Sequence, residues 1–232
     1  MIKPKNLLSA GLIFTIKGLA RIFYKTEATW ITPKEEIDWD KIKVAVILNH
    51  TSLFEPLFFS AIPGKKLWRA IDRTVVPVAD VTMNRPIIGR LFKTLLPNVV
   101  TITRKRDDTW TNVMQLVEGN SLLAIFPEGR MKRANGLDKY GKPMSVKAGI
   151  AEILSKIESG KMLIAYSGGL HHVQAPGQII PKVFKKIKIA FELVDIREYK
   201  EALKAENNRI FRRNVVADLE ERMKKHCPTQ LS

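Results

Sequence analysis

The sequence KVAVILNHTSLFEP, at residues 43–56, joins an apolar run of strand length to a polar turn. The run at 43–48 is apolar almost throughout, which is typical of a strand covered on both faces of a parallel sheet. Asn49 and His50 follow it directly. Because ligands of open α/β sheets bind outside the carboxyl ends of the strands, the residues that begin at Asn49 occupy the place of a binding site.

Further runs of the same kind lie along the chain and alternate with helical patterns. Apolar strands separated by helices indicate a mostly parallel central sheet covered by helices. We therefore expect a single α/β domain, with no internal repeat and no linker that would divide it. The other strands are predicted at 74–79, 99–103, 121–126, 162–166 and 187–193, and the helices at 86–96, 107–118, 146–157 and 199–225.

The N-terminal segment is the most apolar stretch near either end of the chain. Two charges inside it, Lys17 and Arg21, argue against a simple membrane span. We expect an amphipathic helix within residues 1–30 and the main domain at 31–232. Two placements of the helix remain open: in the interface of an anionic bilayer, or packed on the domain's own core. Its apolar stripe consists of Leu8, Leu12, Ile16, Leu19 and Phe23, beside the cations Lys5, Lys17, Arg21 and Lys25.

The composition indicates a folded domain with a large positive charge. The chain has 232 residues, of which 45% are apolar, and 39 Lys+Arg against 23 Asp+Glu give a net charge of +16. This excludes a disordered polyelectrolyte. The excess of cations favours an anionic partner: nucleic acid, a membrane surface or a phosphate-bearing substrate. The single Cys227 cannot form an internal disulfide and favours a reducing compartment.

Several motifs of other enzyme classes fail on their spacing. The run GLDKYGK at 136–142 resembles a P-loop, but Pro143 stands where the Ser or Thr that holds Mg²⁺ belongs. The adjacent His171 and His172 do not face one centre, and no further pair completes a metal site. Ser167 lacks the preceding glycine of a nucleophile elbow. We therefore expect neither nucleotide nor serine hydrolysis, and no metal or other cofactor.

Two segments at strand ends carry the candidate chemistry: NHTSLFE at 49–55 and FPEGR at 126–130. If a helix turn begins near Thr51, Glu55 would lie beneath His50 and accept its Nδ1–H, which leaves Nε2 free as a general base. The alternative is that His50 caps a helix and Glu55 is a solvated acid of its first turn. Geometry alone leaves both interpretations open.

These segments resemble the motifs of the glycerolipid acyltransferases typified by 1-acylglycerol-3-phosphate acyltransferase. The first motif of that family, Asn-His-x4-Asp, matches Asn49 and His50, with Glu55 in place of the Asp. Its third motif begins Phe-Pro-Glu-Gly, as residues 126–129 do. Other blocks follow the family's order over about residues 40–195: VVTITR at 99–104, MLIAY at 162–166 without the family's proline, and KAG at 147–149.

The resemblance implies the transfer of a fatty acyl group from a thioester donor, acyl-CoA or acyl carrier protein, to the free hydroxyl of a lysophospholipid such as 1-acylglycerol-3-phosphate. His50 would be the general base, and Glu55 would hold it and stabilise the imidazolium. The protein would be an O-acyltransferase of phospholipid biosynthesis, bound peripherally to the anionic surface on the cytoplasmic face of a membrane.

The resemblance also implies how the acceptor is bound. Arg104 and Arg130 would receive its phosphate through forked hydrogen bonds. Glu128 would bind the acceptor's hydroxyl or order Arg104, and Gly129 would let the backbone approach the substrate. Arg130 stands one position earlier than the family's arginine.

Two alternatives of other classes remain. Glu55, one methylene longer than Asp, keeps open a catalytically impaired membrane scaffold of the same fold. The clusters RKR at 104–106 and RR at 212–213 keep open a basic nucleic-acid-binding protein. Because the basic residues are spread along the whole chain and the binder leaves His50 unexplained, we expect no nucleic-acid partner.

Overall fold

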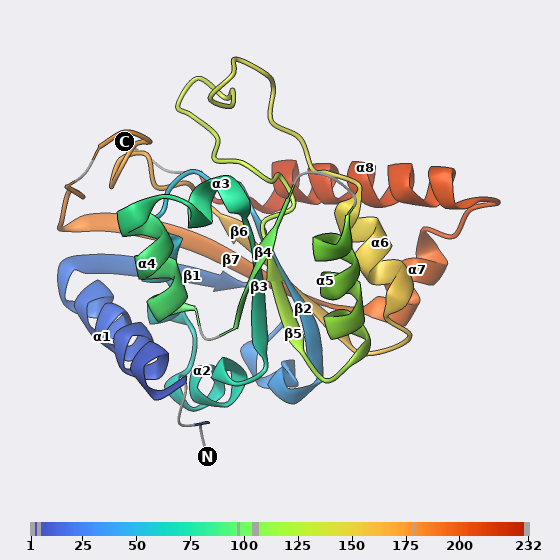
Figure 1. Cartoon of the computed structure of the whole chain (residues 1–232), viewed down its shortest axis with the longest axis horizontal. Coiled ribbons are helices and arrows are strands. Elements are labelled where there is room, and N and C mark those ends of the chain that lie inside the picture. The colour runs from blue at the N-terminus through green and yellow to red at the C-terminus, as the bar shows by residue number, and fades with distance from the viewer. Residues whose placement is uncertain (1–2, 4–5, 97, 104–106, 179, 230–232) are drawn as a thin grey trace.

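The computed structural model describes residues 3, 6–96, 98–103, 107–178 and 180–229. In this part of the chain a sheet of seven strands runs through the centre, in the order β1-β7-β6-β2-β5-β3-β4, and helices cover both of its faces (Figure 1). Neighbouring strands are parallel except β6 and β7, which are antiparallel. The expected single α/β domain with a mostly parallel sheet is confirmed.

Six of the seven strands lie where the apolar runs predict them. The exception is β1, an edge strand. Its sequence YKTEATW is mostly polar, so it does not stand out from the residues that follow the N-terminal helix. The strands are β1 (Tyr24–Trp30), β2 (Ile42–Leu48), β3 (Thr74–Ala79), β4 (Val99–Ile102), β5 (Leu122–Ile125), β6 (Lys161–Ser167) and β7 (Lys185–Asp195).

The helices differ from the prediction in two ways: α2 and α3 were not predicted, and the expected helix at 199–225 is two helices. Asn207 starts the second of them, because its side chain accepts the N–H of Ile210 at 3.0 Å. The helices are α1 (Leu7–Phe23), α2 (Gly64–Ile71), α3 (Asp80–Met83), α4 (Pro86–Leu95), α5 (Asp108–Glu118), α6 (Gly149–Lys156), α7 (Ile196–Ala202) and α8 (Asn208–His226), with 3₁₀ turns η2 (Lys34–Glu36), η3 (Trp39–Lys41) and η4 (Glu55–Ala61).

The central strand β2 shows how the two faces of the sheet are filled. Val44, Val46 and Leu48 point to one face, where they join the buried core under α5, α6 and α8. Ala45 and Ile47 point to the other face, toward the core that includes α1 and η4. Because successive side chains of a strand alternate, a run that is apolar throughout is stable only when both faces are covered.

Helix α1 packs on the domain's own core with one face. The buried side chains include the small Ala10 and Ala20, which allow a close approach. Lys17 is buried too, although the sequence predicts it among the cations beside the apolar stripe. Its ammonium group donates to the carbonyl oxygens of Phe59 (2.8 Å) and Ile62 (2.5 Å), which lie at the C-terminal end of η4. Burial lowers the pKa of Lys17 to about 8, with a further contribution from nearby cations.

Candidate active site

The site lies at the carboxyl ends of β2, β5 and β6, which are neighbours in the sheet. Asn49 ends β2 with a sharp turn, since its φ of 64° is in the left-handed region that Asn tolerates better than most residues. Its side-chain amide donates to the carbonyl oxygen of Ser167 at 2.8 Å, at the end of β6. The turn that presents His50 is thus held from a neighbouring strand.

Glu128 joins the segment after β5 to the segment after β2. Its two carboxylate oxygens accept the backbone N–H groups of Asn49, at 2.8 Å, and of His50, at 3.0 Å. The side chain is buried, and this burial raises its pKa although the two N–H groups act in the opposite direction. Glu128 therefore positions the backbone on both sides of Asn49, a contact that the sequence motifs do not indicate.

Glu55 lies against the imidazole of His50. Its Oε1 is 3.2 Å from Nδ1, and it also accepts the N–H groups of Thr51, at 2.9 Å, and Ser52, at 3.0 Å. No helix turn begins near Thr51, because η4 begins only at Glu55. The carboxylate instead folds back over the loop. Within the described residues, Nδ1 makes no well-aligned hydrogen bond, so the contact with Glu55 is electrostatic and becomes an ion pair when the imidazole is protonated.

The surroundings of His50 act on its pKa in opposite directions. Burial lowers the pKa, whereas the carboxylates of Glu55 and Glu128 raise it, and the net effect is a raised pKa. The ring of Phe126 packs against the imidazole, with 4.5 Å between the ring centroids. An imidazole in this place takes up a proton more readily than burial alone would allow.

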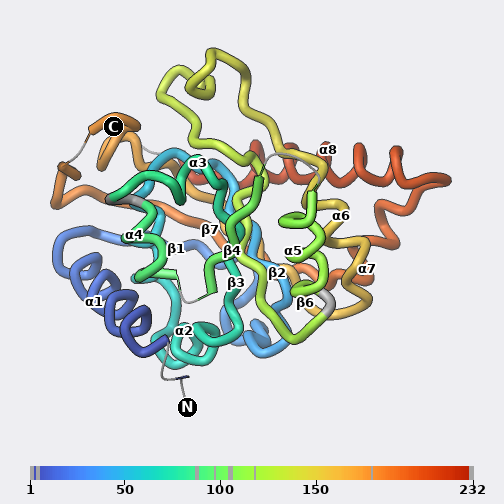
Figure 2. Tube along the Cα trace, viewed as in Figure 1, coloured from blue at the N-terminus to red at the C-terminus, as the bar shows by residue number. Residues whose placement is uncertain are grey.

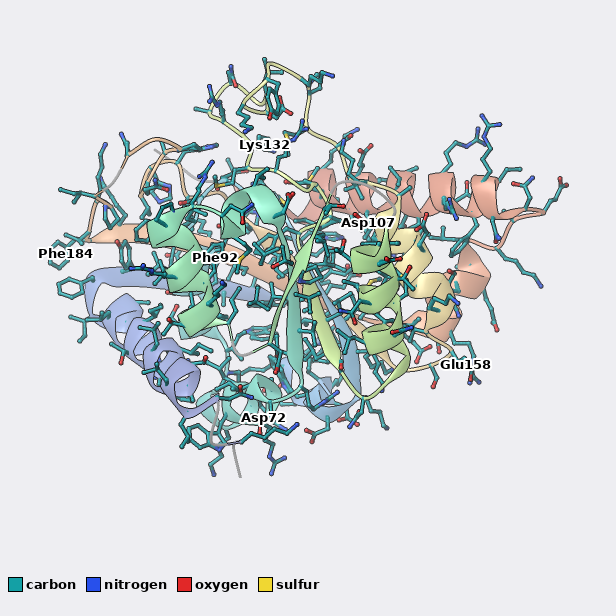
Figure 3. The ribbon with its side chains drawn as sticks, viewed as in Figure 1. Asp72, Phe92, Asp107, Lys132, Glu158 and Phe184 are labelled. Atoms are coloured by element: carbon teal, nitrogen blue, oxygen red, sulfur yellow. The ribbon has the colours of Figure 1, made fainter. Side chains whose placement is uncertain are left out.

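Arg130 and Gly129 lie on the long connection between β5 and α6, which projects from the sheet and carries Lys132 (Figure 3). Gly129 has a φ of 70°, in the left-handed region. Arg130 pairs with the buried carboxylate of Asp138 and packs over the ring of Tyr140, 4.7 Å from its centroid. The guanidinium is thus held from within the same connection.

Asp138 is a residue of this connection that the sequence motifs miss. Its Oδ1 accepts the N–H groups of Tyr140, at 2.7 Å, and Lys142, at 3.0 Å, which flank Gly141 in a tight turn. The N–H of Lys142 is the main cause that lowers the pKa of Asp138 to about 2, and Arg130 contributes further. An Asp between two closely spaced glycines, a turn signal, is the pattern that marks it in the sequence.

A cavity of about 1160 Å³ opens at these residues and continues along one face of the sheet. His50, Glu55, Glu128, Gly129 and Arg130 all line it. Further in, its wall is mainly apolar, and the small side chains of three strands leave the space open: Ala45 on β2, Ala124 on β5 and Ala165 on β6. The cavity exceeds the size of most small-molecule pockets.

The structure thus brings together five of the six site residues predicted from the sequence, whereas Arg104 lies outside the described residues. Among the described residues, no group of three or more His, Cys, Asp or Glu side chains is placed to hold a metal ion. The arrangement combines a candidate general base, a carboxylate that favours its protonated form and a deep apolar space.

The comparisons with known proteins identify the class to which this α/β protein belongs. Residues 31–181 match the family model described as Acyltransferase. Because the match spans more than half of the chain, the chain belongs to the acyltransferase family. The family that the motifs at 49–55 and 126–129 indicate is thereby confirmed.

A solved structure is similar over nearly the whole chain. It is the crystal structure of PlsC from Thermotoga maritima, a 1-acyl-sn-glycerophosphate (LPA) acyltransferase. The similarity has a TM-score of 0.55 at 18% sequence identity and covers 97% of this chain and 85% of that chain. The two proteins therefore share a fold. No curated protein matches the sequence.

Proposed function

We propose that this protein transfers a fatty acyl group from a thioester donor to the free hydroxyl of a lysophospholipid, with 1-acylglycerol-3-phosphate as the acceptor. The observation that carries the proposal is the contact between His50 and the buried Glu55 at the opening of a deep apolar cavity. Family membership supports acyl transfer. The similar fold of PlsC, which is a 1-acyl-sn-glycerophosphate acyltransferase, suggests the acceptor.

His50 acts as the general base of the proposed reaction. Its Nε2 takes the proton of the acceptor hydroxyl while the oxygen bonds to the thioester carbonyl carbon, and Glu55 stabilises the resulting imidazolium. The carbon–sulfur bond then breaks, and the imidazolium returns the proton to the sulfur, so that the products are the acylated lipid and a free thiol. General base catalysis of this kind contributes about 10² to 10⁴ in rate.

The two parts of the cavity suit the two parts of an amphipathic substrate. Its apolar depth accepts an acyl chain, whose transfer from water is favourable. Arg133 and Lys147 line the cavity and give a positive field for a phosphate group, whereas the charge of Arg130 is compensated by Asp138. Both acyl-CoA, with its phosphates, and an acidic acyl carrier protein are compatible with this field as donors.

We further propose that the protein works at the anionic surface of the cytoplasmic face of a membrane, in phospholipid biosynthesis. None of the helices in the described part of the chain has the length and apolarity needed to cross a membrane. The outer side of α1 exposes Leu8 and Ile22, and the net charge of +16 favours anionic lipid.

The first experiment measures thiol release from an acyl-CoA, with and without lysophosphatidic acid, by the wild-type protein and by His50→Ala. We expect acceptor-dependent release that His50→Ala abolishes. His172→Ala is the matched control, since the side chain of His172 contacts the carbonyl of Lys186 and does not line the cavity.

Equal release by the wild type and His50→Ala would remove the case for His50 as the base. If neither protein releases thiol, the assay is repeated with acyl carrier protein and a panel of lysolipids. Vesicle binding without release from any donor would then favour the catalytically impaired scaffold.

A further inference from the structure

We propose that the segment before β7, residues 180–184, makes a second contact with an anionic phospholipid bilayer beside the outer face of α1. The lipid-contact surface, as we name it, consists of Leu8, Leu19 and Ile22 of α1 and of Ile180, Val183 and Phe184. The inference depends on the membrane association proposed above, and it is independent of acyl transfer.

The apolar residues of the lipid-contact surface are strongly exposed. Ile180 is 81% exposed and Phe184 is 75% exposed, while Leu8 and Ile22 on α1 are 71% and 69% exposed. Single exposed apolar residues are normal, but a group of large ones marks a surface that contacts another apolar phase. Figure 3 shows Phe184 at the margin of the molecule, with its ring directed away from the domain.

Two segments far apart in the sequence form this one surface. The N–H of Phe184 donates to the carbonyl of Phe23 at 2.7 Å, and the two rings lie 5.8 Å apart. Leu8, Leu19 and Ile22 follow one stripe of α1, which ends next to Phe23. In Figure 2 the blue tube of α1 and the orange tube before β7 accordingly meet at one side of the molecule.

The backbone of Phe184 has a φ of 58°, in the left-handed region. An aromatic residue is disfavoured there, and such outliers persist where the surrounding structure and a function require them. The hydrogen bond to Phe23 holds this conformation, which directs the ring outward.

Positive charges border the lipid-contact surface. Arg21, Lys25, Lys182 and Lys185 are exposed around the apolar residues. The nearby Glu27 is paired with Lys186 at 3.0 Å, so its charge is compensated. Each cation next to an anionic membrane surface contributes about fivefold to the affinity. This complementarity favours a bilayer of anionic phospholipid as the occupant over a neutral apolar partner.

The connection that ends in this surface begins at the candidate active site. Gln174 accepts the hydroxyl of Ser52 at 2.6 Å, and Pro176 and Gly177 line the cavity. A bilayer seated on Phe184 therefore lies at one end of a segment whose other end borders the cavity. This placement suits an enzyme whose acceptor is a lipid.

The experiment measures flotation with vesicles of phosphatidylcholine, with and without phosphatidylglycerol. The test variant combines Ile180→Asn and Phe184→Asn, because Asn tolerates the left-handed backbone of Phe184. We expect the variant to lose about tenfold or more of its affinity for the anionic vesicles. Ile31→Asn is the matched control: Ile31 is also exposed but follows the other end of β1, and its variant should bind as the wild type does.

Unchanged flotation of the double variant would overturn the inference, as would wild-type protein that binds neutral and anionic vesicles alike. A change in the molecular mass of the double variant by light scattering, without a change in flotation, would assign the surface to a second copy of the chain. Thiol release from a short-chain soluble donor and acceptor, measured on the same samples without vesicles, tests the proposed function separately.

Discussion

Two carboxylates act on His50 from different elements and in different ways. Glu55, at the start of η4, contacts the imidazole nitrogen at 3.2 Å. Glu128, after β5, holds the backbone N–H of His50 at 3.0 Å and does not contact the ring by a hydrogen bond. Both raise the pKa of the imidazole, but Glu55 contributes more, since it is the nearer charge. The effect of Glu55 on the pKa of His50 can therefore be measured from the pH dependence of the activity.

The first prediction concerns Glu55→Gln. The variant removes the nearest negative charge. The pKa of His50 therefore falls, because Glu55 no longer opposes the effect of burial. A general base works only when it is neutral, and activity is lost as the pH falls through its pKa. We expect the acidic limb of kcat/KM to shift to lower pH, while the plateau falls about tenfold to a hundredfold.

The measurement is a pH profile of thiol release, with Glu55→Asp as the matched control. Aspartate keeps the charge but is one methylene shorter, so the acidic limb should stay near its wild-type position while the rate falls. An acidic limb that does not move in Glu55→Gln would show that Glu55 does not set the protonation of His50.

At the scale of elements, the segments between strand and helix determine where the side chains of the site lie. The turn after β2 uses Asn49 at a φ of 64°, and the turn after β5 uses Gly129 at a φ of 70°. A Cβ atom on Gly129 would meet no atom within 4 Å. Glycine is therefore required there by the backbone conformation alone, with no steric conflict in addition.

The second prediction compares Gly129→Ala with Gly11→Ala. At Gly129 the left-handed conformation costs about 1 to 2 kcal/mol for a residue with a Cβ atom, so the variant should be less stable by about that amount. Gly11 lies in α1, where a Cβ atom also meets nothing within 4 Å. Alanine there should raise the stability by about 0.5 to 1 kcal/mol.

Urea unfolding of both variants and the wild type measures these differences. The two substitutions add the same methyl group into open space, so changes of the same sign would contradict the conformational explanation. Activity of Gly129→Ala should fall more than that of Gly11→Ala, because Gly129 lines the cavity and Gly11 does not.

For the whole molecule, the packing of α1, α2, α4 and η4 against one face of the sheet encloses the cavity. Ala45 and Ala124 are partners in the register of β2 and β5, and both line it. Large side chains at these positions would fill the space, whereas the opposite face of β2 is closely packed by Val44, Val46 and Leu48. One face of β2 thus lines the cavity, and the other face packs in the core.

The third prediction concerns Ala124→Phe, which places an aromatic ring in the cavity. Long acyl chains should no longer fit, while short ones still reach His50. We expect thiol release from a long-chain donor to fall at least about tenfold relative to a short-chain donor.

The ratio of the two rates is its own control, since a general loss of folded protein lowers both equally. A ratio that does not change would mean that the acyl chain lies elsewhere.

Much of the fold is readable in the sequence because its cause is local. Strands covered by helices tend to form apolar runs, and six of the seven strands, including the edge strand β4, coincide with such runs. Strand β1 is missed because its sequence YKTEATW is mostly polar and contains no apolar run. The break between α7 and α8, before Asn207, is not visible in the sequence. Both helices pack on the same core, so their apolar residues follow one spacing.

The fold class and the motifs at the strand ends can be read from the sequence, because both follow from residues close together in the chain. What these residues contact becomes clear only in the folded protein. Glu128 reaches Asn49 and His50 across almost eighty positions, and Lys17 finds its carbonyl partners on η4. The cavity likewise exists only where strands and helices meet. Such contacts depend on how distant segments pack against one another, and no local pattern in a single sequence shows which segments will meet.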